Sequence, residues 1–217
     1  MDSPLYDRIV DSEDLTAQAR IRDAAMRQFG ELGFDKATMR GIAEEARVSQ
    51  GLVRHHFGSK EALRDACDAY LARAIERINE QVKADDSQGS INYVGIAGAA
   101  FGPFRQYVVR ALVEGRATQF FDTLADLSAQ WMDEGDRQRE DEPDTSANER
   151  ATVAAAMSLS IALLHPHIGR RLGVDPFSKE GEYLLARVLL DLYSHPYLTP
   201  DEAADFKARL PKPGHGK

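Results

Sequence analysis

Hydrogen-bond donors and cations gather in one short segment of this sequence, between residues 38 and 60. Amide and guanidinium groups can read base edges in a nucleic-acid groove, whereas hydroxyl, imidazole and ammonium groups reach backbone phosphates. The segment holds side chains of all these kinds: Thr38, Arg40, Ser49, Gln50, Arg54, His55 and Lys60. Taken singly, such residues are more often solvated surface positions, so their spacing must show whether they form a nucleic-acid-binding site.

The spacing predicts two short helices joined by a tight turn. Thr38 is a suitable N-cap for a helix that runs to about Ala46 and turns Ile42 and Ala43 inward. Ser49 can cap the next helix, because its hydroxyl is able to accept a backbone N–H of the first turn. Two helices in this arrangement are what a DNA major groove of about 12 Å accepts.

The second of these helices is predicted to be amphipathic. A step of about 100° per residue places Val53 and Phe57 on one side and Gly51 opposite them, with His55 on the side of Gly51. The apolar pair would face the core, which leaves the other face free. There Gly51 has no Cβ and lets a ligand come close to the backbone, while Leu52 can touch a thymine methyl group.

Further helices flank this pair. Upstream, an apolar residue recurs every four positions before Gly33, which is a plausible helix stop: Ile21, Ala25 and Phe29. Downstream, Ser59 can cap a longer helix that continues to about residue 84 as a connector. We therefore expect a helix-turn-helix DNA-binding domain over 17–64, preceded by a disordered acidic tail over 1–16.

Beyond residue 84 the pattern stays helical, with glycine and proline between the helices. We expect helices at about 91–101, 103–114, 116–138, 147–171, 178–194 and 200–209. No segment shows the alternation of apolar and polar residues that is typical of a strand. The predicted fold class is all-α, with a three-helix DNA-binding domain at the N-terminus and a larger helical domain over 85–217.

Charge and composition narrow the function classes. The 217-residue chain has a net charge of −8, yet residues 17–64 carry nine basic and six acidic side chains. One basic segment in an acidic chain favours a local nucleic-acid contact over a protein coated with nucleic acid. The sequence has no run of about 18 apolar residues and no signal-peptide pattern, so we expect a cytoplasmic protein without a membrane partner. The single cysteine, Cys67, excludes an internal disulfide.

The basic segment resembles a known family. At fixed spacing and without gaps, residues 17–64 are similar to the DNA-binding domain of TetR-family transcriptional regulators at these positions: Phe29, Gly33, Phe34, Thr38, Ile42, Ala43, Ala46, Val48, Ser49, Gly51, His55, Phe57, Ser59, Lys60, Glu61 and Leu63. Two positions depart from the family pattern. Arg54 stands where an aromatic residue, commonly tyrosine, is usual, and Arg47 replaces a common glycine.

This resemblance implies roles for individual residues and a mode of action. Thr38, His55 and Lys60 match positions that contact phosphates, and Gln50 and Leu52 match positions that read bases. Family members bind double-stranded DNA operators as homodimers, and their larger domain binds a small-molecule effector. We therefore expect a repressor that a largely apolar effector releases from a palindromic operator, with half-sites about 34–36 Å apart. Nothing in the residues fixes repression over activation, and no cofactor is implied.

The larger domain is compatible with dimerisation. Small residues permit close helix contact within 151–164: Ala151, Ala154, Ala155, Ser158 and Ala162. A later helix offers an apolar stripe: Leu184, Leu185, Val188, Leu189 and Leu192. Two such helices from each subunit could form a four-helix interface; the alternative is that both are core helices of a monomer, but the resemblance to the family favours the dimer.

The same domain supplies candidates for an effector pocket. Apolar bulk comes from seven residues: Phe101, Phe104, Tyr107, Phe120, Phe121, Trp131 and Met157. Three polar side chains could orient a ligand: Gln119, Asp122 and His165. This composition favours an apolar or aromatic effector.

Two other function classes remain open for a helical chain. A helical-bundle enzyme would need a nucleophile with a base, or carboxylates with Glu-x-x-His spacing, and we find neither, so no catalytic residue is predicted. The basic segment disfavours a protein-interaction module that has lost DNA binding. His165 and His167 are two residues apart, a spacing that argues against a metal site, and Pro166 is expected to bend a helix or adjust its end.

Overall fold

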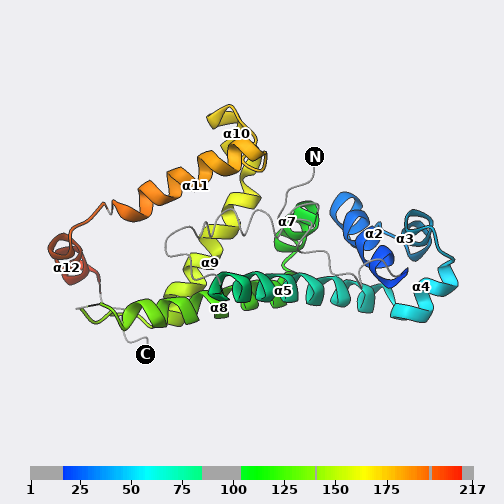
Figure 1. Cartoon of the computed structure of the whole chain (residues 1–217), viewed down its shortest axis with the longest axis horizontal. Helices are drawn as coiled ribbons and strands as arrows, with labels where there is room; N and C mark the ends of the chain where they lie inside the picture. Colours follow the sequence, from blue (N-terminus) through cyan, green and yellow to red (C-terminus); the bar gives the residue numbers. More distant parts are fainter. Residues whose placement is uncertain (1–16, 85–103, 140, 196, 212–217) are drawn as a thin grey trace.

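The computed structural model describes residues 17–84, 104–139, 141–195 and 197–211. Every regular element in these ranges is an α-helix (Figure 1): α2 (Ala17–Leu32), α3 (Met39–Ala46), α4 (Gln50–Phe57), α5 (Lys60–Ala84), α7 (Arg105–Val113), α8 (Thr118–Asp136), α9 (Ala147–Leu163), α10 (His165–Leu172), α11 (Lys179–Ser194) and α12 (Pro200–Arg209). The all-α prediction is confirmed. The predicted tail over 1–16, the predicted helix over 91–101 and Phe101 lie outside the described residues.

Helices α2, α3 and α4 pack together at one end of the long helix α5 (Figure 1). Six large side chains form the core of this unit, each with 0–2% of its surface exposed: Ile21, Met26, Phe29, Ile42, Val53 and Leu63. Full burial of one such side chain contributes about 1.5–3 kcal/mol, so several together hold short helices that would not be stable alone.

The three N-caps predicted in this unit are confirmed. The Thr38 hydroxyl accepts the N–H of Gly41 at 3.0 Å, and the Ser49 hydroxyl accepts the N–H of Leu52 at 3.1 Å. Ser59 accepts a backbone N–H in the first turn of α5 at 3.0 Å. A cap of this kind contributes about 1 kcal/mol and fixes where a helix begins.

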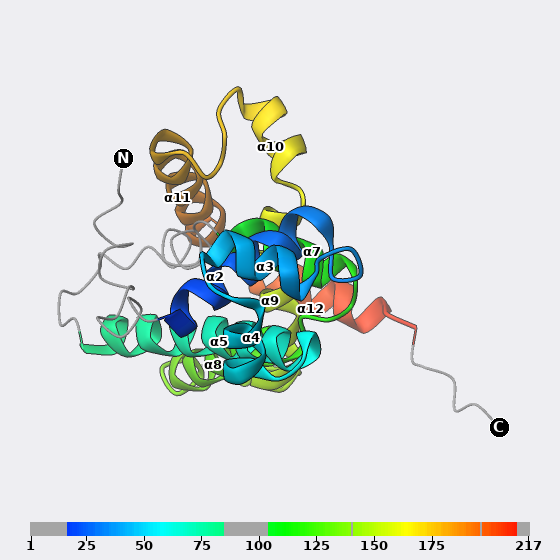
Figure 2. The same ribbon diagram turned by 90° about the vertical axis from the view of Figure 1, so that its right-hand side faces the viewer.

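Of the later helices, α8 lies along α5 and α7 lies against α2. Helix α8 packs along α5, and α9 packs against α8 (Figures 1 and 2). Helix α7 lies against α2, where a Cβ on Gly30 would come within 2.8 Å of the backbone nitrogen of Tyr107. Only glycine permits that approach. One apolar cluster includes Leu63 near the start of α5 together with Tyr107, Phe120 and Leu159 from the later helices.

The prediction of one helix over 147–171 is wrong, because the structure has two helices there. Helix α9 ends at Leu163 and α10 begins at His165, with a bend of 65° between them. Pro166 has no N–H to donate to the carbonyl of Ala162, four residues earlier. His165 Nδ1 contacts that carbonyl at 2.8 Å instead, so the break satisfies the acceptor that proline leaves open.

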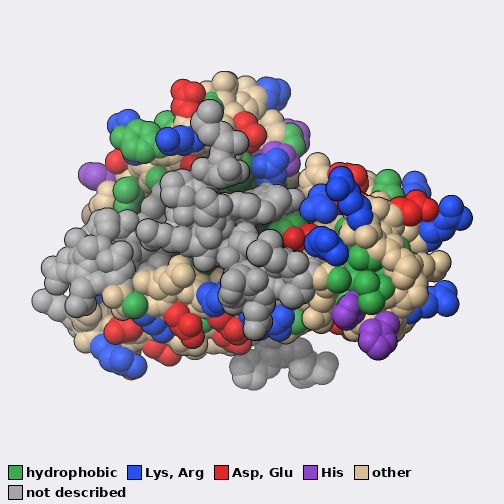
Figure 3. Space-filling model, turned by 45° about the vertical axis from the view of Figure 1, so that its right-hand side comes forward, with side chains coloured by type: hydrophobic (Ala, Val, Ile, Leu, Met, Phe, Trp, Pro, Cys, Tyr) green, Lys and Arg blue, Asp and Glu red, His purple; other side chains and the backbone are tan. Residues whose placement is uncertain are grey.

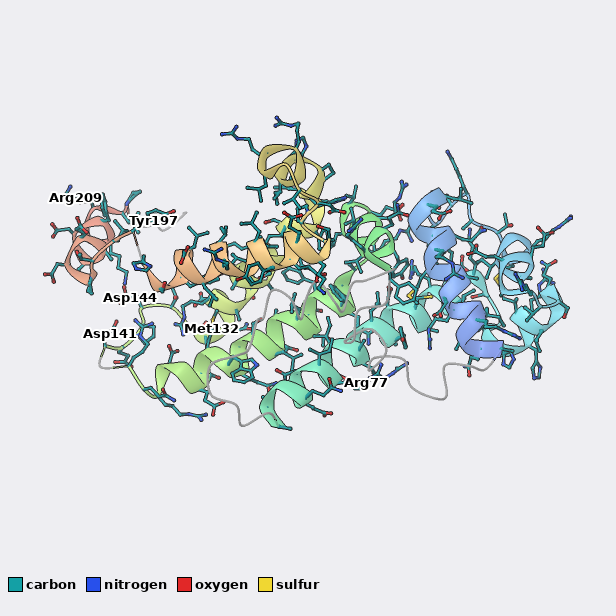
Figure 4. All side chains as sticks on the ribbon, turned by 45° about the horizontal axis from the view of Figure 1, so that its top comes forward. Arg77, Met132, Asp141, Asp144, Tyr197 and Arg209 are labelled. Atoms are coloured by element: carbon teal, nitrogen blue, oxygen red, sulfur yellow. The ribbon has the colours of Figure 1, made fainter. Side chains whose placement is uncertain are left out.

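Helices α11 and α12 follow, each with the N-cap hydrogen bond that a serine or threonine can supply. Ser178 accepts the N–H of Gly181 at 3.1 Å at the start of α11. Lys207 on α12 pairs with Asp144 at 2.6 Å, and Figure 4 shows Asp144 on the α12 side of the loop that follows α8. Among the described helices none alone is long and apolar enough to span a membrane, and α9 with α10 meets that criterion only as a bent pair.

Candidate nucleic-acid interface

Helix α4 presents the face that the sequence predicts. Val53 is fully buried, and Leu52 and Phe57 are half-buried. Five residues of α4 are exposed: Gln50, Gly51, Arg54, His55 and His56. A Cβ on Gly51 would have only the Ser49 hydroxyl within 4 Å, so the backbone at the start of α4 is open to a ligand. The helix therefore combines an anchored apolar side with an accessible polar side.

The turn between α3 and α4 depends on an unusual backbone conformation. Arg47 has a φ of +57°, the left-handed region that glycine adopts more easily than any other residue. In this conformation the Arg47 N–H donates to the Glu44 carbonyl at 3.2 Å, and the Val48 N–H donates to the Ala43 carbonyl at 3.0 Å. These bonds close the end of α3 and set the direction in which α4 leaves it.

Polar contacts clamp α3 onto α2. Glu45 on α3 accepts hydrogen bonds from Arg27 Nε at 2.6 Å and from Gln28 Nε2 at 3.0 Å, both on α2. Close packing accompanies these bonds, since a Cβ on Gly41 would lie 3.1 Å from Gln28 Oε1. The clamp fixes α3, and through it the position of α4.

The cations of this region differ in how strongly they are held. Arg54 forms no ion pair with any described residue and is exposed. Arg40 pairs with Glu44 at 2.8 Å, but their side chains are 80% and 65% exposed, and such a surface pair contributes little. Figure 3 shows lysine, arginine and histidine side chains at the surface of this end of the molecule. Arg40 and Arg54 are therefore free to exchange water or a weak partner for a phosphate.

Lys60 has a role that the sequence did not indicate. Its ammonium group donates to three backbone carbonyls between α2 and α3: those of Phe34 at 2.8 Å, Ala37 at 3.1 Å and Asp35 at 3.4 Å. An ammonium has three protons, so these bonds use its full capacity. Lys60 thus holds the loop that precedes Thr38, and a phosphate contact would require it to give up one of these acceptors.

The candidate effector residues that the structure describes occupy three separate environments. Phe104, Tyr107 and Phe120 are buried in the apolar cluster that includes Leu63. Trp131 on α8 is half-buried and donates its indole N–H to Asn79 of α5 at 2.7 Å. The remaining residues lie nearer the surface.

Exposure separates the other candidates from that cluster. Gln119 and Asp122 are exposed on α8, and Met157 on α9 has 60% of its surface exposed. Phe121 is half-buried beside the cluster, and His165 lies at the break between α9 and α10. The predicted pocket also includes Phe101, which lies outside the described residues. The effector pocket therefore remains a prediction.

The sequence analysis missed the contacts that join α7 to α2 and α5. The Tyr107 hydroxyl donates a hydrogen bond to Asp68 on α5. Arg110 on α7 donates to the carbonyls of Gly30 and Glu31, both at 3.4 Å. Gly30 was the available signal, because a glycine inside a helical pattern often marks a close approach of another element.

Comparison with known proteins gives a consistent family. A family model described as bacterial regulatory proteins, tetR family, matches residues 21–67. The HTH-type transcriptional regulatory protein RaaS of Mycobacterium tuberculosis is 38% identical over 148 residues, which cover 66% of this chain and 68% of that protein. The HTH-type transcriptional regulator UidR of Escherichia coli strain K12 is 36% identical over 109 residues, 48% of this chain and 54% of that protein.

Solved structures share the fold. Salmonella enterica GusR superposes with a TM-score of 0.57 at 21% identity, covering 84% of this chain and 100% of GusR. The fatty acid degradation regulator FadR from Bacillus halodurans gives a TM-score of 0.59 at 13% identity, covering 90% of this chain and 100% of FadR. At these identities the likeness concerns the arrangement of helices.

Proposed function

This chain belongs to the TetR family of bacterial regulatory proteins, and from that premise we propose that it is a repressor that a small, largely apolar effector releases from a palindromic DNA operator. One observation is the main support for the DNA-binding part of this proposal. Helix α4 is anchored by the fully buried Val53 while Gln50, Gly51, Arg54 and His55 remain exposed on its other side. A short, rigidly held helix with such a face fits a major groove.

Within this proposal, the contacts divide by chemistry. The amide of Gln50 and the apolar side chain of Leu52 read base edges, and Gly51 lets the start of α4 approach the duplex. Phosphates are contacted by Arg54 and by the other side chains around α4: Thr38, Arg40, Ser49, His55 and Lys60. Thr38 and Ser49 also cap helices, so their hydroxyls act beside backbone N–H groups that attract anions.

A homodimer fits the surface of the later helices. The small residues Ala151, Ala155 and Ala162 are buried within the chain, so they are used to pack α9 rather than left for a partner. Large apolar side chains stay exposed on α9 and α11, among them these: Val153, Met157, Tyr183, Leu190 and Tyr193. Exposed apolar surface of this extent favours a protein partner, and a second copy would place two α4 helices on successive half-sites.

This arrangement suggests a separate role for each part of the chain. We propose that residues 17–64 bind DNA, that α5 connects, and that 85–217 bind the effector and the second subunit. One solved structure of this fold, a gamma-butyrolactone receptor with a TM-score of 0.55 at 19% identity, is described by its small-molecule ligand. An effector acts only through different affinities for the DNA-bound and free conformations.

Selection from random double-stranded DNA, followed by gel shift with the DNA next to its own gene, tests the proposal. We expect one palindromic sequence to be enriched and its binding to weaken steeply as salt rises, because phosphate contacts release counterions. Absence of any sequence-specific binding at low salt would refute the DNA-binding role. Binding that no apolar ligand weakens would refute the effector part alone.

A further inference from the structure

The backbone of the turn between α3 and α4 is strained at one residue. Arg47 has a φ of +57°, and among the residues that the structure describes it is the one non-glycine residue with a positive φ. Glycine adopts this conformation without the steric cost that a Cβ adds. Strain of this kind gathers at functional sites, where the surrounding structure maintains it. An arginine at this position therefore points to a role for its side chain.

The side chain of Arg47 is exposed and has no partner in the part of the chain that the structure describes. It forms no ion pair, side-chain hydrogen bond or ring contact with any residue there. The carboxylates nearest to it in the sequence are already engaged, since Glu44 pairs with Arg40 at 2.8 Å and Glu45 accepts hydrogen bonds from two residues of α2. The guanidinium group thus makes no contact within the fold that would offset the strain of its backbone.

Arg47 lies next to residues that the proposed function assigns to DNA. It comes shortly before Ser49, the N-cap of α4, and Gln50, the first residue of that helix. Two trans peptides separate Arg47 from Ser49, so their Cα atoms are at most about 7.6 Å apart. Helices α3 and α4 lie at the end of the molecule away from α11 and α12 (Figure 1). A duplex that meets the start of α4 therefore comes within reach of a side chain as long as that of arginine.

We propose that Arg47 is a further DNA-contact residue, which binds an operator phosphate at the edge of the groove that α4 enters. A guanidinium group can donate two parallel hydrogen bonds to a phosphate, and it stays charged at every working pH. The contact rests on the proposed function, because it requires α4 to dock in the major groove. It also gives the strained turn a physical explanation, since the contact offsets the strain only in the complex with DNA.

Stability and DNA affinity should therefore respond in opposite directions at this position. Arg47→Gly removes both the strain and the guanidinium group, so it should melt at a higher temperature and yet bind the operator about tenfold more weakly. Arg47→Ala loses the guanidinium group but keeps the strain, so it should bind as weakly as the glycine variant without melting higher. Arg47→Lys keeps a positive charge and should retain part of the affinity.

Fluorescence anisotropy of the full-length protein on the operator found by random-site selection, repeated at several salt concentrations, tests the contact. Loss of one phosphate contact should reduce the slope of log affinity against log salt by about 0.9 for each bound subunit, in the glycine and alanine variants alike. Arg73→Ala is the matched control, because it removes an exposed arginine about 20 Å along α5 from Lys60. It should keep the wild-type slope. Thermal melts verify that each variant folds.

The outcomes distinguish failure of this contact from failure of the proposed function. Wild-type affinity and salt slope in Arg47→Ala, while Arg54→Ala still weakens binding, overturn the contact and leave the docking of α4 intact. Weaker binding in Arg47→Gly alone also overturns it, because an effect confined to glycine comes from the backbone of the turn. An equal fall of the slope in Arg73→Ala does the same, since it reflects the loss of any positive charge. A wild type that binds no sequence specifically overturns the proposed function together with the contact.

Discussion

The phenol of Tyr107 on α7 donates a hydrogen bond to the carboxylate of Asp68 on α5, and both side chains are buried. The backbone of Tyr107 lies against Gly30 of α2, so this one residue contacts both α2 and α5. Burial holds the pKa of Tyr107 well above its ordinary value, which keeps the phenol a donor at every working pH. The pair therefore links the two parts of the chain.

Removing the donor from this pair should destabilise the fold. Tyr107→Phe keeps the ring but leaves the buried carboxylate of Asp68 without its hydrogen bond, at a cost of about 1–3 kcal/mol in the free energy of unfolding. Urea denaturation measures this loss. Tyr197→Phe, which removes a hydroxyl from a residue that is 87% exposed, is the matched control and should have no effect. Equal stability of both variants would mean that the hydrogen bond contributes nothing.

The same carboxylate should make stability depend on pH. Burial raises the pKa of Asp68, and the hydrogen bond from Tyr107 and the charge of Arg64 only partly oppose this. The folded state therefore favours the protonated acid, and this stabilising contribution is lost as pH rises through the raised pKa. The free energy of unfolding of Asp68→Asn, relative to wild type, should increase as the pH rises above about 4, the ordinary pKa of an aspartate. A difference that stays constant as the pH rises would contradict the shift.

Glycine at position 47 should stabilise the DNA-binding unit. Arg47 has a positive φ, which costs a residue with a Cβ about 1–2 kcal/mol relative to glycine. Arg47→Gly should raise the free energy of unfolding by about 0.5–1 kcal/mol, after the greater flexibility of glycine in the unfolded chain is subtracted. Arg47→Ala removes the same side chain but keeps the strain, so it should give no gain. Equal melting temperatures for Gly and Ala variants would rule out the strain.

Two substitutions on α4 should separate base reading from phosphate contact. Gln50→Ala should change the preferred sequence in a random-site selection, with a loss of about 1–3 kcal/mol at the affected base pair. Arg54→Ala should weaken binding to all sequences and reduce the dependence on salt by about one counterion. Fluorescence anisotropy at several salt concentrations distinguishes the two effects. An unchanged sequence preference in Gln50→Ala and an unchanged salt slope in Arg54→Ala would reject this docking of α4.

Local signals explain which features could be predicted from the sequence. Thr38, Ser49 and Ser59 mark helix starts through hydrogen bonds to residues three positions ahead, so their roles need no knowledge of the fold. The buried face of α4 follows from helical periodicity alone. Cys67 on α5 is buried, and burial raises the pKa of its thiol.

Contacts between distant residues could not be predicted in the same way. Lys60 binds carbonyls 23 to 26 residues earlier, and Asp68 lies 39 residues before Tyr107. The break at Leu164 had a local cause in Pro166, but proline near a helix start is also common, and the sequence left both outcomes open. Arg116, which follows α7, lies over the ring of Phe34 only because α7 packs against α2.

A charge placed on α11 should separate the proposed dimer into monomers. Leu190 is 65% exposed in a single chain, and the proposed interface would bury it against the second copy. Leu190→Asp would then place an unpaired carboxylate in an apolar contact, which should weaken dimerisation at least about tenfold. Sedimentation velocity at several protein concentrations measures the change. Val113→Asp alters an apolar residue that is 69% exposed at the end of α7, a helix that is not part of the proposed interface, and should sediment like the wild type. A wild-type protein that stays monomeric at every concentration, or a Leu190→Asp variant that dimerises normally, would place the interface elsewhere, because a charge cannot be buried there without a measurable loss of affinity.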